Sequence, residues 1–394
     1  MSLDSSGEVG RRIAVARRAR RMSQPELAAA AHMSLSMLRK VEQGSRTLSD
    51  DALDAVAAAL QLDVSRLLTD STRVDGRVRA TFPALSAAIA AYDIPATGPH
   101  RSLTALERAA ADAEAWRLGA QYLRLAVAAP ALITETLTAL HGLPAEPDRK
   151  RAARLLVSVA RSADAVAYKY GARDLSARLI DLMRWAAPQA DDPVVSATVG
   201  YVRTETFFMA RAHRSGLRAL HIAMDEAPIA ADPRNGAALG ALHMRAAVVA
   251  GRLGDADAAG AHLMHAERLA EGLREGVYEG TAFGPASVRV HRMSVAVGLG
   301  GDHAADALSL LRGWSPPRDL PAERRSGFYI ELARAQLWSG RMNHAFDSLR
   351  TARAIAPQHT REHPWAREVA VTLRRLKRSD AASLTSFVEW IGAL

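Results

Sequence analysis

Most of the chain after residue 103 consists of paired helical segments that recur at a nearly constant interval. The clearest pair lies in SGFYIELARAQLWSGRMNHAFDSLRTARAIAPQ. Small residues there allow two antiparallel helices to touch, a glycine turns the chain between them, and a proline ends the second helix. These positions are Ala333, Gly340, Ala345, Leu349, Ala352 and Pro357. One such pair cannot bury its apolar face alone, so the pairs must stack into a superhelix with a concave face.

Other stretches repeat the same pattern with less regular spacing. One contains Ala247, Gly254, Ala259, Leu263 and Ala266, and an earlier one contains Gly171, Ile180 and Pro188. Ala223 and Pro228 mark a unit between them, and a weaker unit covers residues 290–313. Pro188 and Pro228 are 40 residues apart, longer than the ~34 residues of the tetratricopeptide repeat that these units resemble. We therefore expect about five or six such repeats with extended helices or enlarged loops.

The fold class predicted for the whole chain is all-α, because no alternating run of β-branched residues exceeds a few positions. Polar or proline-rich joints in TDSTRVDGRVRA and YDIPATGPHRS separate three parts. The predicted parts are a compact N-terminal unit at 1–72, a linker with a short helix at 73–102, and a repeat domain at 103–394.

Composition limits where such a chain can work. It has 394 residues, no cysteine, no signal-peptide pattern and no uncharged apolar run of 18 residues. We expect a cytoplasmic, nucleoid-associated protein that does not enter a membrane. The net charge of +9 is weak evidence, since 47 of 51 cations are arginine, as a G+C-rich genome imposes. Its placement is more informative, because residues 1–46 hold nine cations against four acids.

The basic N-terminal stretch contains RRMSQPELAAAAHMSLSMLRKVEQGSR, two short helical patterns around a brief break. Ser23 can cap a helix whose third residue is Glu26, which makes a capping box, and Pro25 suits the first turn. Ser34 can cap the second helix, whose apolar positions include Leu38 and Val41. Two helices joined by so short a turn cross steeply, so the second should project from the surface.

This stretch resembles the helix-turn-helix of the lambda-repressor-like, or Xre, family. The resemblance rests on SQPELA, Ala28, Met33, the two apolar residues of the second helix and the VEQGSR exit. It implies that the second helix enters the major groove of double-stranded DNA. The DNA-contacting residues that it implies are Gln24, Ser34, Leu35, Ser36, Arg39, Lys40, Ser45 and Arg46. Gln24, Ser45 and Arg46 would contact phosphates, and an ion pair would join Arg17 to Glu42.

One turn position departs from the family pattern. The family usually has glycine with a positive φ where this chain has His32. Histidine tolerates that conformation at a cost of about 1 kcal/mol relative to glycine, so we expect the turn to survive. Ser49 should cap the next helix, and Asp63 should cap a further one that ends by Leu68. So small a unit makes few base contacts, which predicts a homodimer on an inverted-repeat operator with half-sites ~34 Å apart.

A DNA-binding head followed by repeats is similar in layout to the peptide-pheromone-sensing regulators and to large actinobacterial regulators. The layout implies a small-molecule or peptide effector in the concave groove. The groove residues that the repeat register predicts are Arg161, Tyr168, Tyr201, Glu205, Phe208, Arg252, His291, Arg334 and Trp338. Aromatic and cationic groups suit a ligand with an apolar body and an acidic group, or an acidic peptide. With only Asn235 and Asn343 in the chain, the asparagine clamp typical of peptide-sensing members is missing.

Other motifs do not predict chemistry. The pairs His262 with His265 and His359 with His363 have metal-ligand spacing but no obvious third ligand, so no metal is expected. GLGGDH lacks the features of a phosphate loop, and no paired carboxylates or nucleophile stand out, so we expect neither a cofactor nor an enzyme. Two alternatives to a ligand-controlled regulator stay open. One is a helical protein-interaction scaffold, and the other is a constitutive repressor regulated by a protein partner.

Overall fold

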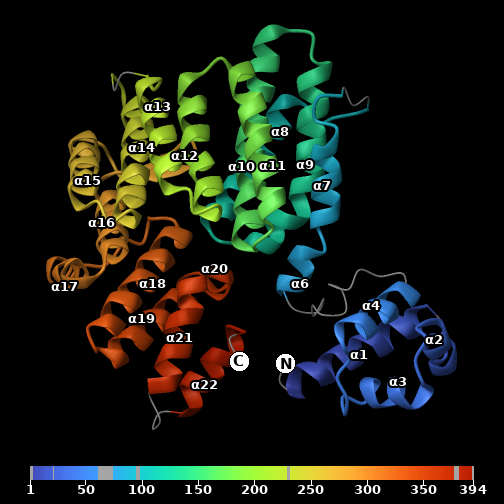
Figure 1. Cartoon of the computed structure of the whole chain (residues 1–394). Coiled ribbons are helices and arrows are strands. Elements are labelled where there is room, and N and C mark those ends of the chain that lie inside the picture. Colours follow the sequence, from blue (N-terminus) through green and yellow to red (C-terminus); the bar gives the residue numbers. More distant parts are fainter. Residues whose placement is uncertain are drawn as a thin grey trace. The chain divides into compact units, whose positions relative to one another are not determined.

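The computed structural model describes residues 3–20, 22–60, 74–94, 98–228, 231–376 and 381–392. The chain divides into two compact units, Met1–Ala80 and Thr81–Leu394 (Figure 1). Hereafter these are unit 1 and unit 2. The all-α prediction is confirmed, apart from one short β-hairpin in unit 2. The helix predicted to start at Asp63 lies outside the described residues.

The described residues of unit 1 form five helices. They are α1 (Leu3–Ala19), α2 (Gln24–Ala30), α3 (Leu35–Glu42), α4 (Asp50–Ala59) and α6 (Val74–Arg79). Their apolar faces meet in a core whose fully buried members are Ile13, Leu27, Leu38, Val56 and Leu60. The burial of these side chains provides most of the stability of so small a unit.

Local chemistry fixes the helix ends of unit 1 as the sequence predicts. The hydroxyls of Ser23, Ser34 and Ser49 each accept a hydrogen bond from a backbone N–H three residues later, and Ser23 forms the full capping box with Glu26. His32 has a φ of 51°, the left-handed conformation expected at that turn. The break between α2 and α3 is therefore a defined turn.

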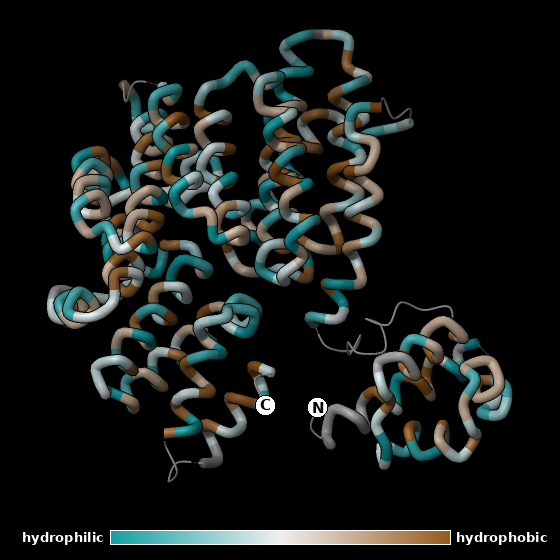
Figure 2. The backbone as a smooth tube through the Cα atoms, viewed as in Figure 1, coloured by the Kyte–Doolittle hydropathy of each residue, from teal (hydrophilic) through white to brown (hydrophobic). Residues whose placement is uncertain are grey.

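Unit 2 is a series of helix pairs. The pairs are α8 (Leu103–Leu118) with α9 (Tyr122–Gly142), α10 (Glu146–Lys169) with α11 (Arg173–Ala186), α12 (Pro193–Met209) with α13 (His213–Asp225), α14 (Pro233–Arg252) with α15 (Ala256–Ala270), α16 (Pro285–Leu299) with α17 (Gly301–Leu310), and α18 (Ala322–Trp338) with α19 (Met342–Ile355). A 3₁₀ turn, η1 (Ala187–Ala190), follows α11, and the unit ends with α20 (Pro357–Glu362), α21 (Pro364–Leu376) and α22 (Ala381–Trp390). Brown and teal positions interleave along these helices in Figure 2, as expected for helices that bury one face.

Most of the turns within these pairs place a residue with a positive φ, but not always a glycine. Gly171, Gly254 and Gly340 have φ values between 72° and 77°, as the repeat pattern predicts. Ala120 and Arg211 occupy the equivalent turns after α8 and α12 with φ values of 55° and 54°. Because these two residues are not glycine, the sequence pattern is weak in the first part of the repeat domain.

The stretch 73–102, which the sequence predicts to be a linker with a short helix, divides between the units. Helix α6 belongs to unit 1, whereas α7 (Phe82–Ala90) belongs to unit 2. Leu85 and Ile89 of α7 are buried, and the helix packs against α9 and α11. Unit 2 therefore begins before the predicted boundary at residue 103.

A β-hairpin interrupts the helices between α15 and α16. Its strands are β1 (Gly276–Tyr278) and β2 (Thr281–Phe283), paired antiparallel with Tyr278 opposite Thr281. The sequence analysis predicts no strand here, because the segments are too short to show an alternating pattern. Phe283 is completely buried and lies over Gly240 of α14, where an added Cβ would come within 2.0 Å of its ring.

One described helix, α9, is long and apolar enough to span a membrane by length and composition. More than half of its candidate span is buried, and it packs between α8 and α10. The burial is that of a core helix in a helical domain.

Candidate nucleic-acid interface and interior site

Helix α3 is amphipathic and has one polar edge on the surface of unit 1. Leu38 and Val41 anchor it in the core, whereas Ser36, Arg39 and Lys40 are exposed. Arg46, in the loop that follows, is exposed as well. The arrangement presents cations from one helix and its exit loop, as a helix that enters a DNA groove requires.

An ion pair ties α1 to the end of α3. The Arg17 guanidinium donates to both carboxylate oxygens of Glu42, at 2.8 and 3.0 Å, and both side chains are nearly buried. Burial alone would raise the pKa of Glu42, but hydrogen bonds from Arg17 and Gln24 outweigh it and lower the pKa below its usual value. The pair predicted from the family resemblance is thus present, and it fixes where α3 lies relative to α1.

Several predicted DNA-contacting residues are engaged inside the protein. The Gln24 side-chain amide donates to Glu42 at 2.8 Å, so a phosphate contact by this amide depends on its second hydrogen. The Ser34 hydroxyl caps α3, and Leu35 is half buried against the core. The Ser45 hydroxyl donates to the Lys40 carbonyl at 2.9 Å, so it would have to rotate to donate to a phosphate.

In unit 2, the hairpin turn is held by buried arginines from the first helix pairs. Arg117 of α8 donates to the Gly280 carbonyl at 2.7 Å, and Arg161 of α10 donates to the Glu279 carbonyl and, at 2.6 Å, to the Thr281 hydroxyl. Burial, followed by the nearby charge of Arg117, lowers the pKa of Arg161 to about 9. The prediction that Arg161 faces an effector therefore needs correction, because the protein's own hairpin occupies its donors.

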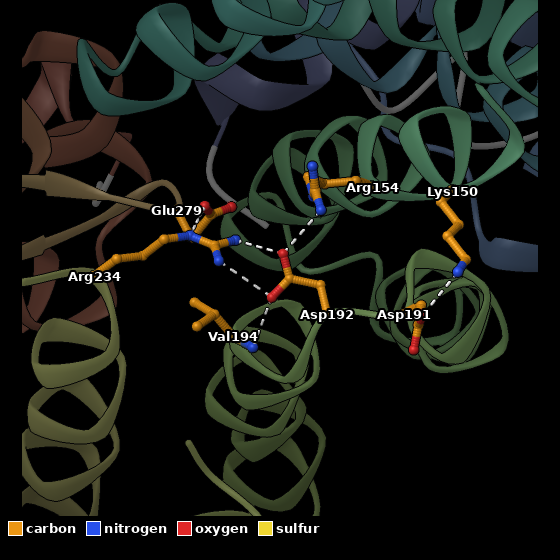
Figure 3. Close-up of polar contacts among 7 residues, drawn as sticks. All are labelled: Lys150, Arg154, Asp191, Asp192, Val194, Arg234 and Glu279. Atoms are coloured by element: carbon orange, nitrogen blue, oxygen red, sulfur yellow. Dashed lines mark hydrogen bonds and ion pairs between the residues drawn. The ribbon is translucent and has the colours of Figure 1, made fainter. Parts of the chain in front are cut away.

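An ion network also holds the hairpin, through Glu279 (Figure 3). Arg234 of α14 bonds Glu279 at 2.6 Å and Asp192 at 2.7 Å, and Arg154 bonds Asp192 at 2.9 Å. Asp192 also caps α12 by accepting from the Val194 N–H. Burial raises the pKa of Asp192, yet the hydrogen bond and charge of Arg234, the Val194 N–H and the charge of Arg154 together outweigh this effect and keep the pKa below its usual value.

Aromatic rings and guanidinium groups alternate along the interior of unit 2. Arg245 lies 4.0 Å from the Tyr201 ring centroid and 5.6 Å from that of Phe208. Arg252 follows, 4.1 Å from Phe208 and 5.3 Å from Trp365. We call the whole series the cation–π ladder, and its members are Tyr201, Arg245, Phe208, Arg252, Trp365, Arg334 and Trp338.

The far end of the cation–π ladder reaches solvent. Arg334 lies 4.0 Å from the Trp365 ring and 4.9 Å from the Trp338 ring, and Trp338 is 49% exposed. At the near end Tyr201 is buried. The ladder thus extends from the interior of unit 2 to its surface and joins helices α12, α14, α18 and α21.

Buried polar atoms without a partner in the protein lie along the ladder. They include the Arg245 Nε, the Arg334 Nε and one carboxylate oxygen of Glu205. Glu205 approaches Arg245 only to 3.7 Å, although both side chains are 18% exposed. Leaving such an atom unbonded costs about 1–3 kcal/mol, so a cluster of them is a common mark of a binding site.

Not every predicted groove residue belongs to the ladder. Tyr201, Phe208, Arg252, Arg334 and Trp338 do, and Glu205 lies beside it. His291 is instead buried, with its Nδ1 near the Ser287 carbonyl and its Nε2 2.8 Å from an Arg324 nitrogen. Tyr168 is half buried. Burial, and then the charge of Glu205, raises its pKa, whereas the charge of Arg245 lowers it, so Tyr168 lies near these two residues of the ladder region.

Two ladder members, Arg245 and Trp365, are absent from the prediction. Arg245 shares α14 with the predicted Arg252, seven residues away, so the helical period alone indicates that it lies on the same face. Trp365 lies in α21, beyond the repeats from which the register was taken.

Comparison with known proteins identifies unit 1. Residues 8–69 match the family model described as a helix-turn-helix domain. Unit 1 is a DNA-binding helix-turn-helix domain. The chain that carries it is accordingly a DNA-binding regulator of transcription, with helical repeats after the domain.

Two solved structures match most of the chain at low identity and low TM-score. The apo form of the competence regulator ComR from Streptococcus vestibularis is 10% identical, with 98% of this chain and 99% of that chain covered and a TM-score of 0.29. PlcR from Bacillus thuringiensis, in complex with the peptide PapR7 and DNA, is 15% identical, with 67% and 95% covered and a TM-score of 0.23. None of the curated proteins matches the chain.

The helix-turn-helix domain has one feature that sequence reasoning missed. Gly10 of α1 lies so close to α3 that an added Cβ would be 1.8 Å from the Val41 carbonyl oxygen. A glycine within a helix is the only signal in the sequence that could have indicated this close approach.

A cluster of histidines lies outside the helix-turn-helix domain, across α13, α14 and α15. His262 has one ring nitrogen 3.3 Å from His221 and the other 3.0 Å from His243, and His265 stacks on His243 at 4.9 Å. Across the described ranges, no group of three or more His, Asp or Glu side chains could hold a metal ion. Burial, with the neighbouring histidines, lowers the pKa of His243 and of His262 to about 4.

This cluster predicts an acid sensitivity of unit 2. An unfolded histidine titrates near pH ~6.5, so between that pH and about 4 the unfolded chain binds protons that the folded cluster excludes. The free energy of unfolding should therefore fall as the pH is lowered through this window. Urea unfolding of the full chain at pH 7 and pH 5 measures the effect. His262→Gln should flatten the dependence, whereas His303→Gln, an exposed histidine of α17, should not. If the free energy of unfolding depended on pH equally in both variants, the histidine cluster would not be the source of the acid sensitivity.

Proposed function

We propose that the protein is a sequence-specific transcription regulator that binds an inverted-repeat operator as a homodimer and responds to an effector bound in unit 2. The observation that carries the proposal is the exposed polar edge of α3, anchored by buried Leu38 and Val41 within a helix-turn-helix domain. One such helix contacts few base pairs. Two copies reading half-sites ~34 Å apart would supply the specificity that a regulator needs.

The assignment of roles on this edge follows from position. Ser36, Arg39 and Lys40 lie on the helix, where side chains reach base edges, whereas Arg46 lies in the loop, where side chains reach the backbone. Removing a base contact changes which sequence is preferred. Removing a phosphate contact weakens binding to all sequences alike.

Selection from random duplexes, followed by binding measurements at several salt concentrations, tests these roles. Arg39→Ala or Lys40→Ala should alter the selected sequence and weaken the free energy of binding to the original operator by about 1–3 kcal/mol. Arg46→Ala should weaken all duplexes equally and reduce the salt slope by about 1. Arg312→Ala, an exposed arginine after α17, is the matched control and should change neither quantity. A wild-type protein that prefers no duplex over random competitor would refute the proposal.

The effector part of the proposal rests on the cation–π ladder and its unbonded polar atoms, which form a polar, partly buried site inside a helical repeat. Small-molecule and peptide sites share this mixture of aromatic walls and a few oriented polar groups. Ligand binding there would shift the equilibrium between conformations of the regulator, provided the ligand binds them with different affinity.

The two alternatives predict different results for charge reversal. A helical interaction scaffold would keep its cellular effect in the Lys40→Glu, Arg46→Glu variant, whereas a regulator would lose it. A constitutive repressor with a protein partner would lose the effect in that variant but keep it when ladder residues are replaced. Helix α3 is anchored by Leu38 and Val41 and exposes Arg39 and Lys40, and this arrangement favours the regulator over the scaffold.

A further inference from the structure

Two guanidinium groups of the cation–π ladder lie on the same indole ring. The Arg334 carbon Cζ is 4.0 Å and the Arg252 Cζ 5.3 Å from the Trp365 ring centroid, so two positive charges meet at one side chain. Burial lowers the pKa of Arg252, and the positive charges of Arg245 and then Arg334 lower it further, because like charges repel. A neighbouring anion would relieve this repulsion.

The protein supplies only part of that negative charge. Glu331 accepts from Arg334 at 3.1 Å, but burial raises the pKa of Glu331 to about 7, so this carboxyl is only partly ionised at neutral pH. Among the residues that the structure describes, no carboxylate lies within ion-pair distance of Arg252. The contacts that Arg252 makes are with the faces of Phe208 and Trp365.

The ring contacts of Arg252 and Arg334 leave guanidinium N–H groups that can donate to an oxyanion. An arginine whose flat faces are covered by aromatic rings still has its N–H groups directed outward in the plane of the guanidinium, where they match a carboxylate or phosphate. The Arg334 Nε is buried without an acceptor in the protein, and so is the Nδ1 of His363, whose ring is 5.4 Å from that of Trp365. These atoms lie around one indole.

The surroundings also suit the rest of a ligand. Trp338 is 49% exposed next to Arg334, and Arg252 reaches solvent although its guanidinium lies between protein rings, so a small molecule can approach from solvent. Phe208 and Trp365 are half buried with arginines against their rings, so the half-exposed Trp338 offers the free aromatic surface for a flat apolar body. The arrangement therefore contains an anion-binding end and an aromatic wall within one short section of the ladder.

We propose that Arg252 and Arg334, held on Trp365, form an oxyanion-binding subsite that selects effectors with a carboxylate or phosphate on an aromatic body. The inference deepens the proposed function, since it names the chemical class of effector that unit 2 binds. The two arginines bind the oxyanion through their edge N–H groups, and the ring of the ligand stacks beside Trp338 and Trp365. Arg161, which holds the hairpin, takes no part.

Calorimetric titration of the full chain with matched naphthalene probes tests this subsite without DNA. 1-Naphthoate and 1-naphthyl phosphate carry the oxyanion, and 1-naphthamide is the neutral control of the same shape. At least one oxyanion should bind about tenfold to 100-fold more tightly than the amide, and the tighter of the two identifies the head group. Equal binding of all three probes, or binding of none, would overturn the proposal.

Variants then locate the site. Arg252→Gln should remove the preference for the oxyanion over the amide without unfolding the protein, because Arg252 forms no ion pair with any residue that the structure describes. Arg334→Gln should do the same, and thermal melting checks that the loss of its bond to Glu331 has not unfolded unit 2. Arg353→Gln is the matched control, since Arg353 stacks on Trp390 at 4.2 Å outside the ladder. An unchanged preference in both ladder variants would also refute the subsite.

The outcomes separate this inference from the proposed function. Normal operator binding with no oxyanion preference would remove the subsite and leave the regulator. Oxyanion binding that depends on Arg252, in a protein without operator specificity, would leave the subsite and remove the regulator.

Discussion

Gly10→Ala should abolish DNA binding by the full chain and unfold the helix-turn-helix domain at physiological temperature. The new Cβ would lie 1.8 Å from the Val41 carbonyl oxygen, whereas contacts below 3.0 Å essentially never occur. The obstacle is backbone, so α1 and α3 must move apart and lose the Arg17–Glu42 pair between them. Overpacking typically costs 1–3 kcal/mol and here should exceed the upper end, a large fraction of the stability of so small a domain.

Circular dichroism during heating, together with operator binding, measures this effect. Alanine is the better helix former by about 1 kcal/mol, so helix propensity alone predicts a more stable protein. Overpacking therefore predicts a lower free energy of unfolding for Gly10→Ala, whereas helix propensity predicts a higher one. Val15→Ala, on the same helix at a position that is 64% exposed, should change neither melting nor binding appreciably. A Gly10→Ala protein that binds its operator with unchanged affinity would show that Gly10 of α1 does not lie against the Val41 backbone of α3.

Phe283→Ala should destabilise unit 2 by about 3–5 kcal/mol, because a completely buried ring would be replaced by a cavity. The ring fills the space above Gly240, and a side chain at that position would collide with it. Its loss should also weaken the hold of Arg117 and Arg161 on the hairpin turn, since Phe283 anchors the strand that carries Thr281.

Urea unfolding monitored by tryptophan fluorescence measures the difference. Val277→Ala is the control in the same hairpin, since Val277 is 42% exposed, and it should cost little. Operator binding should remain in both variants under native conditions, because the helix-turn-helix domain has its own core. If both substitutions had equal effects on the free energy of unfolding, the hairpin would not be anchored by its aromatic residue.

Features governed by neighbouring residues could be predicted from the sequence. The capping hydroxyls of Ser23, Ser34 and Ser49 act within three residues of themselves, whereas the left-handed turn at His32 was expected from the family resemblance. The helix pairs were predictable for the same reason, because apolar periodicity and turn residues are local signals.

Features that depend on contacts between distant segments could not be predicted. Nothing near Gly10 shows that Val41 lies against it, and nothing near Arg161 shows that a hairpin 120 residues later occupies its donors. The ladder is an intermediate case. The helical register found most of its members, but Trp365 enters from a helix beyond the repeats, and only packing brings it against Arg252 and Arg334.

The grip of α8 and α10 on the hairpin sets an order for events during synthesis. A repeat array in which each pair contacts only its neighbours can fold from its first pair as the chain emerges. Here Arg161 must wait for Thr281, 120 residues further along, which at ~5–20 residues per second is a delay of roughly 6 to 24 s. Until then the Arg161 guanidinium stays hydrated, and the first helix pairs lack their contact with the hairpin. The packing of these early helices is thus completed only by a segment that is synthesised late.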